Sequence, residues 1–319
     1  KFMDIMEVLK KLRKYYDENC KKLVFLNEKK LSINNKCKMY YLDVFESVEL
    51  QNYKKLFQEY LVFYIRNRDF FSICNNIKEA RDSDELSKVL NEEGKTVHDN
   101  KGIYPQTDEK KSGIYGELFD DFYLNIVKQE EIMLTYSIRS SFNIPNVRGV
   151  DLVGVKVEEN NLILILSEAK FVSNITSASS ALYDDIVGNN NQLGHVTKEY
   201  INDYVSFIMN KEHSIFFDEK NSEFIRNKLI ELNDLLINHK LLPIDAFNKM
   251  KIKVRFDFFA IYHDNNHNID ERKNYFDIIV DQFNDSIVKT GIDNYDIEVI
   301  FIPTKNTSVD LKKEMELWD

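Results

Sequence analysis

Residues 149–170 contain the side chains of this chain whose types and spacing are suited to chemistry. Asp151 begins one apolar segment, and Glu168 and Lys170 end the next one. Side chains on a strand alternate between its two faces, so Glu168 and Lys170 share a face while Ala169 points the other way. Antiparallel pairing of the two segments would bring Asp151 beside Glu168. The pattern therefore predicts two carboxylates and one ammonium group at one end of a β-hairpin.

Two carboxylates this close repel each other unless a cation lies between them. Mg²⁺ suits such a pair because it prefers oxygen ligands and keeps several of its waters, and Mn²⁺ is the expected substitute. A bound divalent cation lowers the pKa of a water and neutralises charge on a scissile phosphate. Lys170 is then expected to hold the attacking water or the charge of the transition state. The predicted chemistry is metal-dependent hydrolysis of a phosphodiester bond.

The composition of the two segments supports the hairpin. Residues 151–157 are rich in valine and leucine, residues 158–161 form a polar break suited to a turn, and residues 162–166 are uninterruptedly apolar. An acid, one spacer and a lysine also occur by chance in many proteins. The flanking strands are the structural context that favours the catalytic interpretation here.

An amphipathic helix over residues 113–127 is expected to supply a third acid. Glu117 lies in its first turn, where a carboxylate also suits the helix dipole, so a ligand and a mere helix cap are both open interpretations. Asp120 and Asp121 are expected on a solvated face of this helix. The apolar positions that predict the helix are Leu118, Phe122 and Ile126.

The C-terminal half of the chain predicts an α/β core. Residues 253–262 and 297–302 have the composition of buried strands, and residues 272–289 between them have a helical pattern. A strand–helix–strand unit gives a parallel pair with a right-handed crossover. We therefore expect a nuclease domain over residues 110–319.

Residues 1–109 are expected to form a mainly helical N-terminal domain. A short strand is expected within residues 38–45, and the polar stretch 91–113, with two glycines and a proline, is expected to be a linker or mobile loop. No motif in this third of the chain names a function.

The order of these motifs resembles the HamA family, the nuclease subunit of the Hachiman anti-phage system, within the PD-(D/E)xK restriction-endonuclease-like superfamily. The resemblance covers residues 110–190 well and the rest loosely. Ser167 departs from the glycine expected before the Glu-x-Lys, and we expect it to tighten access to the metal. The motifs that carry the resemblance are Gly116-Glu117, Gly149-x-Asp151 and Glu168-Ala169-Lys170-Phe171.

The resemblance implies a fold, an activity and a partner. The implied fold is a restriction-endonuclease-like core, in which helices flank a mixed central sheet. Glu117, Asp151, Glu168 and Lys170 would be the active-site positions, the first three as ligands of Mg²⁺. A HamB-like helicase would hold the nuclease in check until infection or DNA damage is sensed. The released nuclease would then degrade DNA, so that the infected cell dies before the phage spreads.

Basic and small polar side chains near the catalytic pattern are candidates for contact with DNA. In restriction-like folds the helix that follows the catalytic hairpin lines the DNA cleft, and here a helix is expected to begin near Asn174 or Thr176. Close packing of a small-residue face is the alternative role for its residues. The candidates are Arg139, Arg148, Lys156, Ser177 and Tyr183.

Composition limits the remaining choices. The 319-residue chain has a net charge of −10, which counts against a free-standing, tight DNA binder, since affinity for DNA comes from neutralising phosphates. A helicase partner that supplies most of the DNA contact fits this charge better. Three widely spaced cysteines suggest neither zinc nor disulfides. With no apolar run long enough for a membrane span and no evident signal peptide, we expect a bacterial cytoplasmic protein.

Two other functions remain open at the level of sequence. One is a non-catalytic interaction subunit that keeps a restriction-like fold for docking. The other is a PD-(D/E)xK nuclease of a different defence or repair system. Retention of four chemically apt residues favours an enzyme, because a degenerate scaffold has little reason to keep mutually repelling buried acids.

Overall fold

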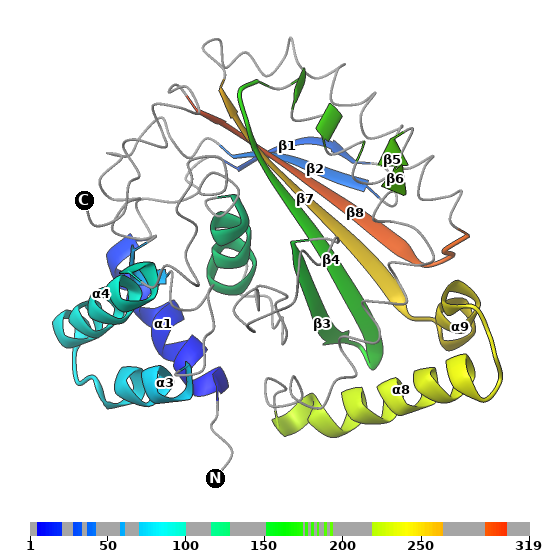
Figure 1. The fold of residues 1–319 in the computed structure, drawn as a ribbon, viewed down its shortest axis with the longest axis horizontal. Coiled ribbons are helices and arrows are strands. Elements are labelled where there is room, and N and C mark those ends of the chain that lie inside the picture. The colour runs from blue at the N-terminus through cyan, green and yellow to red at the C-terminus, as the bar shows by residue number, and fades with distance from the viewer. Residues whose placement is uncertain are drawn as a thin grey trace.

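A six-stranded mixed β-sheet forms the centre of the molecule, with helices on both sides (Figure 1). The computed structural model describes residues 5–20, 28–33, 37–42, 58–60, 70–99, 116–127, 151–174, 176–177, 180–181, 184, 188–189, 192–193, 219–263 and 291–304. The statements that follow concern these residues.

The sheet has the strand order β1-β2-β8-β7-β4-β3. Its four inner strands run parallel, and each edge strand is antiparallel to its neighbour. This arrangement confirms the expected mixed central sheet. The strands are β1 (Glu28–Ile33), β2 (Cys37–Leu42), β3 (Leu152–Glu158), β4 (Asn161–Val172), β7 (Lys253–His263) and β8 (Tyr295–Thr304), and a separate short ladder joins β5 (Gly188–Asn189) to β6 (Gln192–Leu193).

Helices flank the sheet in two groups. In Figure 1, α8 and α9 lie at the lower right, near the turn between β3 and β4, and the N-terminal helices lie at the left. A short helix over residues 116–122 continues into the π-helical turn η1 (Tyr123–Val127). The remaining helices are α1 (Ile5–Cys20), α3 (Phe70–Glu79), α4 (Ser83–Asp99), α8 (Glu219–Ile237) and α9 (Pro243–Met250).

The main hydrophobic core lies between the sheet and the pair α8 and α9. Alternate residues of β4 and β7, such as Leu166 and Phe258, face this core, where they meet Leu232 of α8 and Phe247 of α9. The residues between them are also buried, on the other face of the sheet. Burial on both faces explains why these strands are almost uninterruptedly apolar.

The opposite face of the sheet is covered by residues 116–127. The rings of Tyr123 and Phe259 meet edge to face, with 5.3 Å between their centroids. An ideal Cβ on Gly116 would lie 3.6 Å from Ala169 Cβ and 3.7 Å from Phe171 Cβ. The first turn of this helix therefore lies directly on the end of β4 that carries the Glu-x-Lys motif.

The N-terminal region contributes strands to the same sheet and contacts the helix over residues 116–127. Strand β2 pairs with β8, which confirms the strand expected within residues 38–45. Arg13 Nε donates to the Asn125 carbonyl at 2.8 Å, and Tyr60 Oη donates to Asp121 Oδ1 at 2.6 Å. The predicted boundary between residues 109 and 110 lies outside the described residues, and the division into two domains stays a prediction.

The expected linker over residues 91–113 is wrong for its first part. Residues 91–99 belong to α4, whose Leu86 and Leu90 are buried while Lys88 and Glu92 face solvent as an i,i+4 pair. A helix with one narrow apolar stripe and a charged outer face is polar enough in composition to resemble a linker.

The turn between β3 and β4 is a two-residue hairpin loop. Glu159 and Asn160 have φ values of 48° and 63°, and Glu158 pairs with Asn161. Two consecutive left-handed residues match the right-handed twist of the flanking strands. The polar break of the sequence thus forms the predicted turn, and it fixes the register that places Leu152 opposite Ser167.

None of the helices among the described residues has the length and apolar composition needed to cross a bilayer.

Candidate active site

Asp151 lies where β3 begins, beside the Glu-x-Lys segment of β4. Its Oδ2 accepts a hydrogen bond from the backbone N–H of Ala169 at 2.9 Å. The carboxylate thereby continues the hydrogen-bonded ladder one step beyond the last strand pair, Leu152 and Ser167. This contact holds Asp151 at the edge of the sheet, next to Glu168, as the hairpin predicts.

Glu168 and Lys170 form a largely buried ion pair. Lys170 Nζ lies 2.6 Å from Glu168 Oε1, and Glu168 is only 3% exposed. Both residues follow Leu166 on the face of β4 that is directed toward the α8 and α9 core. The carboxylate therefore stands at the rim of an apolar core, where a charge needs a partner. Three of the four predicted active-site residues are thus brought together.

Glu117 is placed near the same strand but approaches it from the other face. It is 4% exposed, and the preceding residue, Gly116, packs on Ala169 and Phe171. Among the described residues, no group of three or more His, Cys, Asp or Glu side chains is arranged to hold a metal ion. The structure thus brings Glu117 to the motif without closing a three-carboxylate cage, and its role as a ligand stays a prediction.

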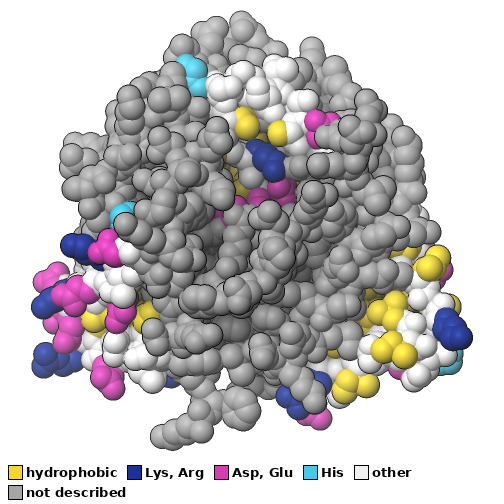
Figure 2. Space-filling view, in the orientation of Figure 1, with side chains coloured by type: hydrophobic (Ala, Val, Ile, Leu, Met, Phe, Trp, Pro, Cys, Tyr) yellow, Lys and Arg dark blue, Asp and Glu magenta, His cyan; other side chains and the backbone are white. Residues whose placement is uncertain are grey.

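The pair of Asp151 and Glu168 suits a hard divalent cation. Carboxylate oxygens are the ligands that Mg²⁺ prefers, and this ion is commonly held by one or two carboxylates together with waters and substrate phosphates. Figure 2 shows acidic side chains recessed beneath a basic one in the upper half of this face of the molecule. The two carboxylates of Asp151 and Glu168 have the composition of a two-carboxylate metal site.

Asp120 is fully buried, which overturns the expectation of a solvated face. The Ser167 hydroxyl lies 2.6 Å from Asp120 Oδ2. Burial raises the pKa of the Asp120 carboxyl well above its ordinary value; the Ser167 hydrogen bond opposes the rise, and the charges of Asp257, Asp151 and Asp121 add to it. The helix is buried on nearly every side, with residues 116–126 all buried, so it has no solvated face for an acid to occupy.

Asp121 is also fully buried, against the same expectation. Its Oδ1 accepts hydrogen bonds from Tyr60 Oη at 2.6 Å and from Asn125 Nδ2 at 2.9 Å. These contacts face the N-terminal helices, where Tyr60, Tyr16 and Phe122 pack edge to face. Asp121 therefore ties the helix to the N-terminal region, while Asp120 ties it to the sheet.

Ser167 lies within the sheet on β4, and its effect on access to the predicted metal stays a prediction. It is completely buried, and alternation places its side chain on the face opposite to Glu168. Its hydroxyl also lies 3.2 Å from the carbonyl oxygen of Asp257, the residue paired with it on β7. The departure from glycine thus adds a hydrogen-bonding group behind the strand rather than in front of it.

Asp257 is a further buried acid that the sequence reasoning missed. It is completely buried, and its Oδ2 accepts hydrogen bonds from Arg255 Nε at 3.1 Å and Nη2 at 2.7 Å. A charged pair inside an otherwise apolar strand was the sequence signal that could have revealed it, because buried strands rarely keep charges without a function or a partner. For Asp120, the signal was its spacing of three residues from Glu117, which puts both on one helical face.

The candidate DNA contacts are described only in part. Arg139, Arg148 and Tyr183 lie outside the described residues. Lys156 pairs with Glu158 near the hairpin turn, and at about 3.4 Å per residue it is about 17 Å along β3 from Asp151. Ser177 lies in the expected helix, where its backbone N–H donates to Asn174 Oδ1 at 2.8 Å. Contact of these residues with DNA stays a prediction.

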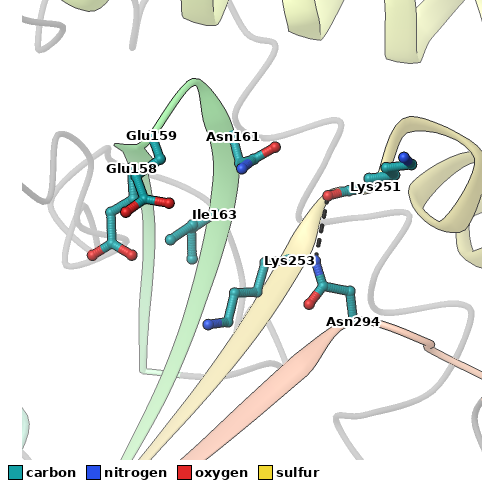
Figure 3. Close-up of a pocket in the computed structure, with 7 residues that line it drawn as sticks. All are labelled: Glu158, Glu159, Asn161, Ile163, Lys251, Lys253 and Asn294. Carbon is teal, nitrogen blue, oxygen red and sulfur yellow. Dashed lines mark hydrogen bonds between the residues drawn. The ribbon is translucent and has the colours of Figure 1, made fainter.

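A cavity of about 560 Å³ lies at the other end of the hairpin (Figure 3). It opens between the β3–β4 turn and the beginnings of β7 and β8. Among its lining residues, Lys253 pairs with Asp296 and Glu158 pairs with Lys156. The cavity reaches β4 at Asn161 and Ile163, and Ile163 is about 17 Å along the strand from Glu168, so this space belongs to no part of the candidate active site.

Comparison with known proteins agrees with the geometry at the hairpin. No curated protein matches the chain. The family model described as HamA matches residues 16–316, which includes every described residue of the candidate site. Because this match spans far more than half of the chain, the protein belongs to the HamA family, whose role is in anti-phage defence.

Proposed function

We propose that this protein is a metal-dependent DNA nuclease, the effector of an anti-phage defence complex, and that a helicase partner holds it in check. The observation that carries the proposal is the placement of Asp151, Glu168 and Lys170 at one end of the β3–β4 hairpin. Membership in the HamA family supports the defence context. Helicase control and DNA as the substrate rest on the family resemblance.

Each residue of the hairpin end has a distinct task in this proposal. Asp151 and Glu168 would hold Mg²⁺ through their carboxylate oxygens. When bound, the ion supplies an activated water and neutralises charge on the scissile phosphate. Lys170 already donates to Glu168, and its side chain is partly exposed to solvent. It would stabilise the charge that develops on the phosphate oxygens.

Strand β4 preorganises these groups. The backbone N–H of Ala169 holds the Asp151 carboxylate by a hydrogen bond. The apolar core packed beneath Glu168 restricts the position of the Glu168 carboxylate. The site thus rests on a strand that pairs with β7 through Glu168 and Lys170 and with β3 up to Ser167, and sites on such rigid elements hold their geometry better than sites on loops.

The test is DNA cleavage by the purified chain with Mg²⁺ and with EDTA, on linear and supercoiled DNA. We expect Asp151→Ala, Glu168→Ala and Lys170→Ala each to abolish cleavage while the chain stays folded. The Lys253→Ala variant is a matched control, because it breaks a partly buried ion pair with Asp296 where β7 begins, away from Glu168. Full cleavage by the Glu168→Ala variant would contradict the assignment of these hairpin residues as the nuclease site.

Helicase control needs a second arm of the assay. If the isolated chain is inactive, the same reaction is run with the partner helicase and ATP. Cleavage that appears only then, and disappears with Glu168→Ala, identifies a partner-gated nuclease. Failure in both arms identifies a non-catalytic interaction subunit instead.

A further inference from the structure

A buried polar contact joins the helix over residues 116–127 to β4. Asp120 Oδ2 and Ser167 Oγ are 2.6 Å apart, and both residues are completely buried. Asp120 comes one helical turn after Glu117, and Ser167 directly precedes Glu168. The contact therefore links the element that carries one predicted ligand to the element that carries another.

The direction of the helix makes this contact a positional constraint. Gly116 lies on Ala169 and Phe171, while Asp120 lies on Ser167, so the helix runs opposite to β4 along its surface. A shift of the helix along the strand would break the contact and move Glu117 by the same amount. Among buried groups, such a shift leaves polar atoms without hydrogen-bond partners, which is unfavourable.

The Ser167 hydroxyl has two oxygen neighbours and only one hydrogen. It lies 2.6 Å from Asp120 Oδ2 and 3.2 Å from the Asp257 carbonyl oxygen. A carbonyl can only accept a hydrogen bond, so both contacts are satisfied when Asp120 is protonated and donates to Ser167, which in turn donates to Asp257. The raised pKa of Asp120, in the field of Asp257, Asp151 and Asp121, agrees with a neutral carboxyl group.

We propose that Asp120 is a positioning residue of the candidate nuclease site, and that its hydrogen bond to Ser167 fixes Glu117 relative to Asp151, Glu168 and Lys170. The proposal rests on the proposed metal-dependent function. Asp120 itself touches neither the predicted metal nor the substrate. It acts through the helix and through strand β4, much as a group behind a metal ligand determines where that ligand points.

The experiment measures Mn²⁺ binding to the purified chain by electron paramagnetic resonance of the free ion, together with thermal unfolding and DNA cleavage. We expect Asp120→Ala to weaken Mn²⁺ binding by about tenfold, the scale at which outer residues control metal affinity. Ser167→Ala should do the same, and the double variant should be no worse than either single variant, because all three lose one contact.

Two variants separate positioning from a general loss of stability. Asp120→Asn should keep wild-type Mn²⁺ binding, since its amide N–H can donate to Ser167 as the protonated carboxyl does. Glu59→Ala is the matched control: Glu59 is another buried acid, held by Tyr15 at 3.0 Å and Ser87 at 2.6 Å within the N-terminal helices. It should lower the unfolding temperature without weakening Mn²⁺ binding.

The outcomes are distinguishable. If the wild-type chain binds no Mn²⁺, both the proposed metal-dependent function and the proposed role of Asp120 are wrong. Wild-type binding that Asp120→Ala leaves unchanged, or that Glu59→Ala weakens equally, overturns the positioning role alone. Weakened binding in Asp120→Ala and Ser167→Ala, with rescue by Asp120→Asn, supports it whether or not the isolated chain cleaves DNA.

Discussion

Single residues of the candidate site were predictable where strand geometry determines them. Glu168 and Lys170 are separated by one residue at the end of an apolar run, so their shared face follows from alternation alone. The burial of Asp120 was not predictable in this way. It depends on Ser167, a residue 47 positions further along the chain, and on the burial of the helix on almost every side, which local periodicity does not reveal.

The buried ion pair of Lys170 and Glu168 leads to a prediction about stability. Lys170→Met should lower the free energy of unfolding in EDTA by about 3 kcal/mol, because it removes the ammonium group that pairs with a buried carboxylate. The double variant Glu168→Gln/Lys170→Met should recover most of the loss. Urea denaturation measures both values. Equal stabilities of the single and double variants would show that the pairing contributes little.

A second residue-scale prediction concerns pH. The pKa of Asp120 is raised in the folded chain, so above the unfolded value of about 3.9 the folded state binds more protons than the unfolded state. Its contribution to stability is therefore largest in acid and is lost as pH rises through the raised pKa. Asp120→Asn removes this dependence. The stability of that variant relative to wild type, from urea denaturation at a series of pH values, should increase with pH from about 4 upward; a constant difference would contradict a raised pKa.

At the scale of elements, the hairpin and the parallel pair of β7 and β8 were predictable, because each lies within a short stretch of patterned sequence. The pairing of β2 with β8 was not, since Cys37 aligns with Ile297. No local pattern indicates which distant strand completes a sheet. The prediction of a linker over residues 91–99 was wrong for the reverse reason, because the charged outer face of α4 has the local composition of a linker.

The β3–β4 turn yields a prediction at this scale. Glu159 and Asn160 both have positive φ, a conformation that costs most L-residues about 1 kcal/mol. The exchange Glu159→Asn/Asn160→Gly introduces the favoured pair for this turn. It should raise the free energy of unfolding by about 1 kcal/mol and leave cleavage unchanged, since the turn is remote from Glu168. A change in cleavage would mean that the turn takes part in the site.

At the scale of the whole molecule, the N-terminal region and the predicted nuclease region share one sheet and several buried contacts. Strands β1 and β2 extend the sheet beyond β8, and Tyr60 and Arg13 hold the helix that carries Glu117. Two regions that share one sheet and these buried contacts are expected to unfold as one unit.

A fragment of residues 110–319 tests the division into two domains. We expect it to lack a cooperative thermal transition, because it loses β2, one of the two strands paired with β8, and the Tyr60 hydroxyl that donates to the buried Asp121. Circular dichroism and calorimetry of the fragment and the full chain provide the comparison. A soluble fragment with a sharp transition of its own would establish the predicted boundary at residue 110 as a true domain boundary.

The parallel pairing of β2 with β8 also has a consequence for synthesis. On the ribosome, β2 emerges early and its partner emerges only with residues 295–304. Until then β7, which flanks the Glu-x-Lys strand, has an open edge, and the hydrophobic core beneath Glu168 lacks the side chains of β8. For a protein whose proposed activity is lethal to its own cell, this order of assembly delays a rigid active site until most of the chain has left the ribosome.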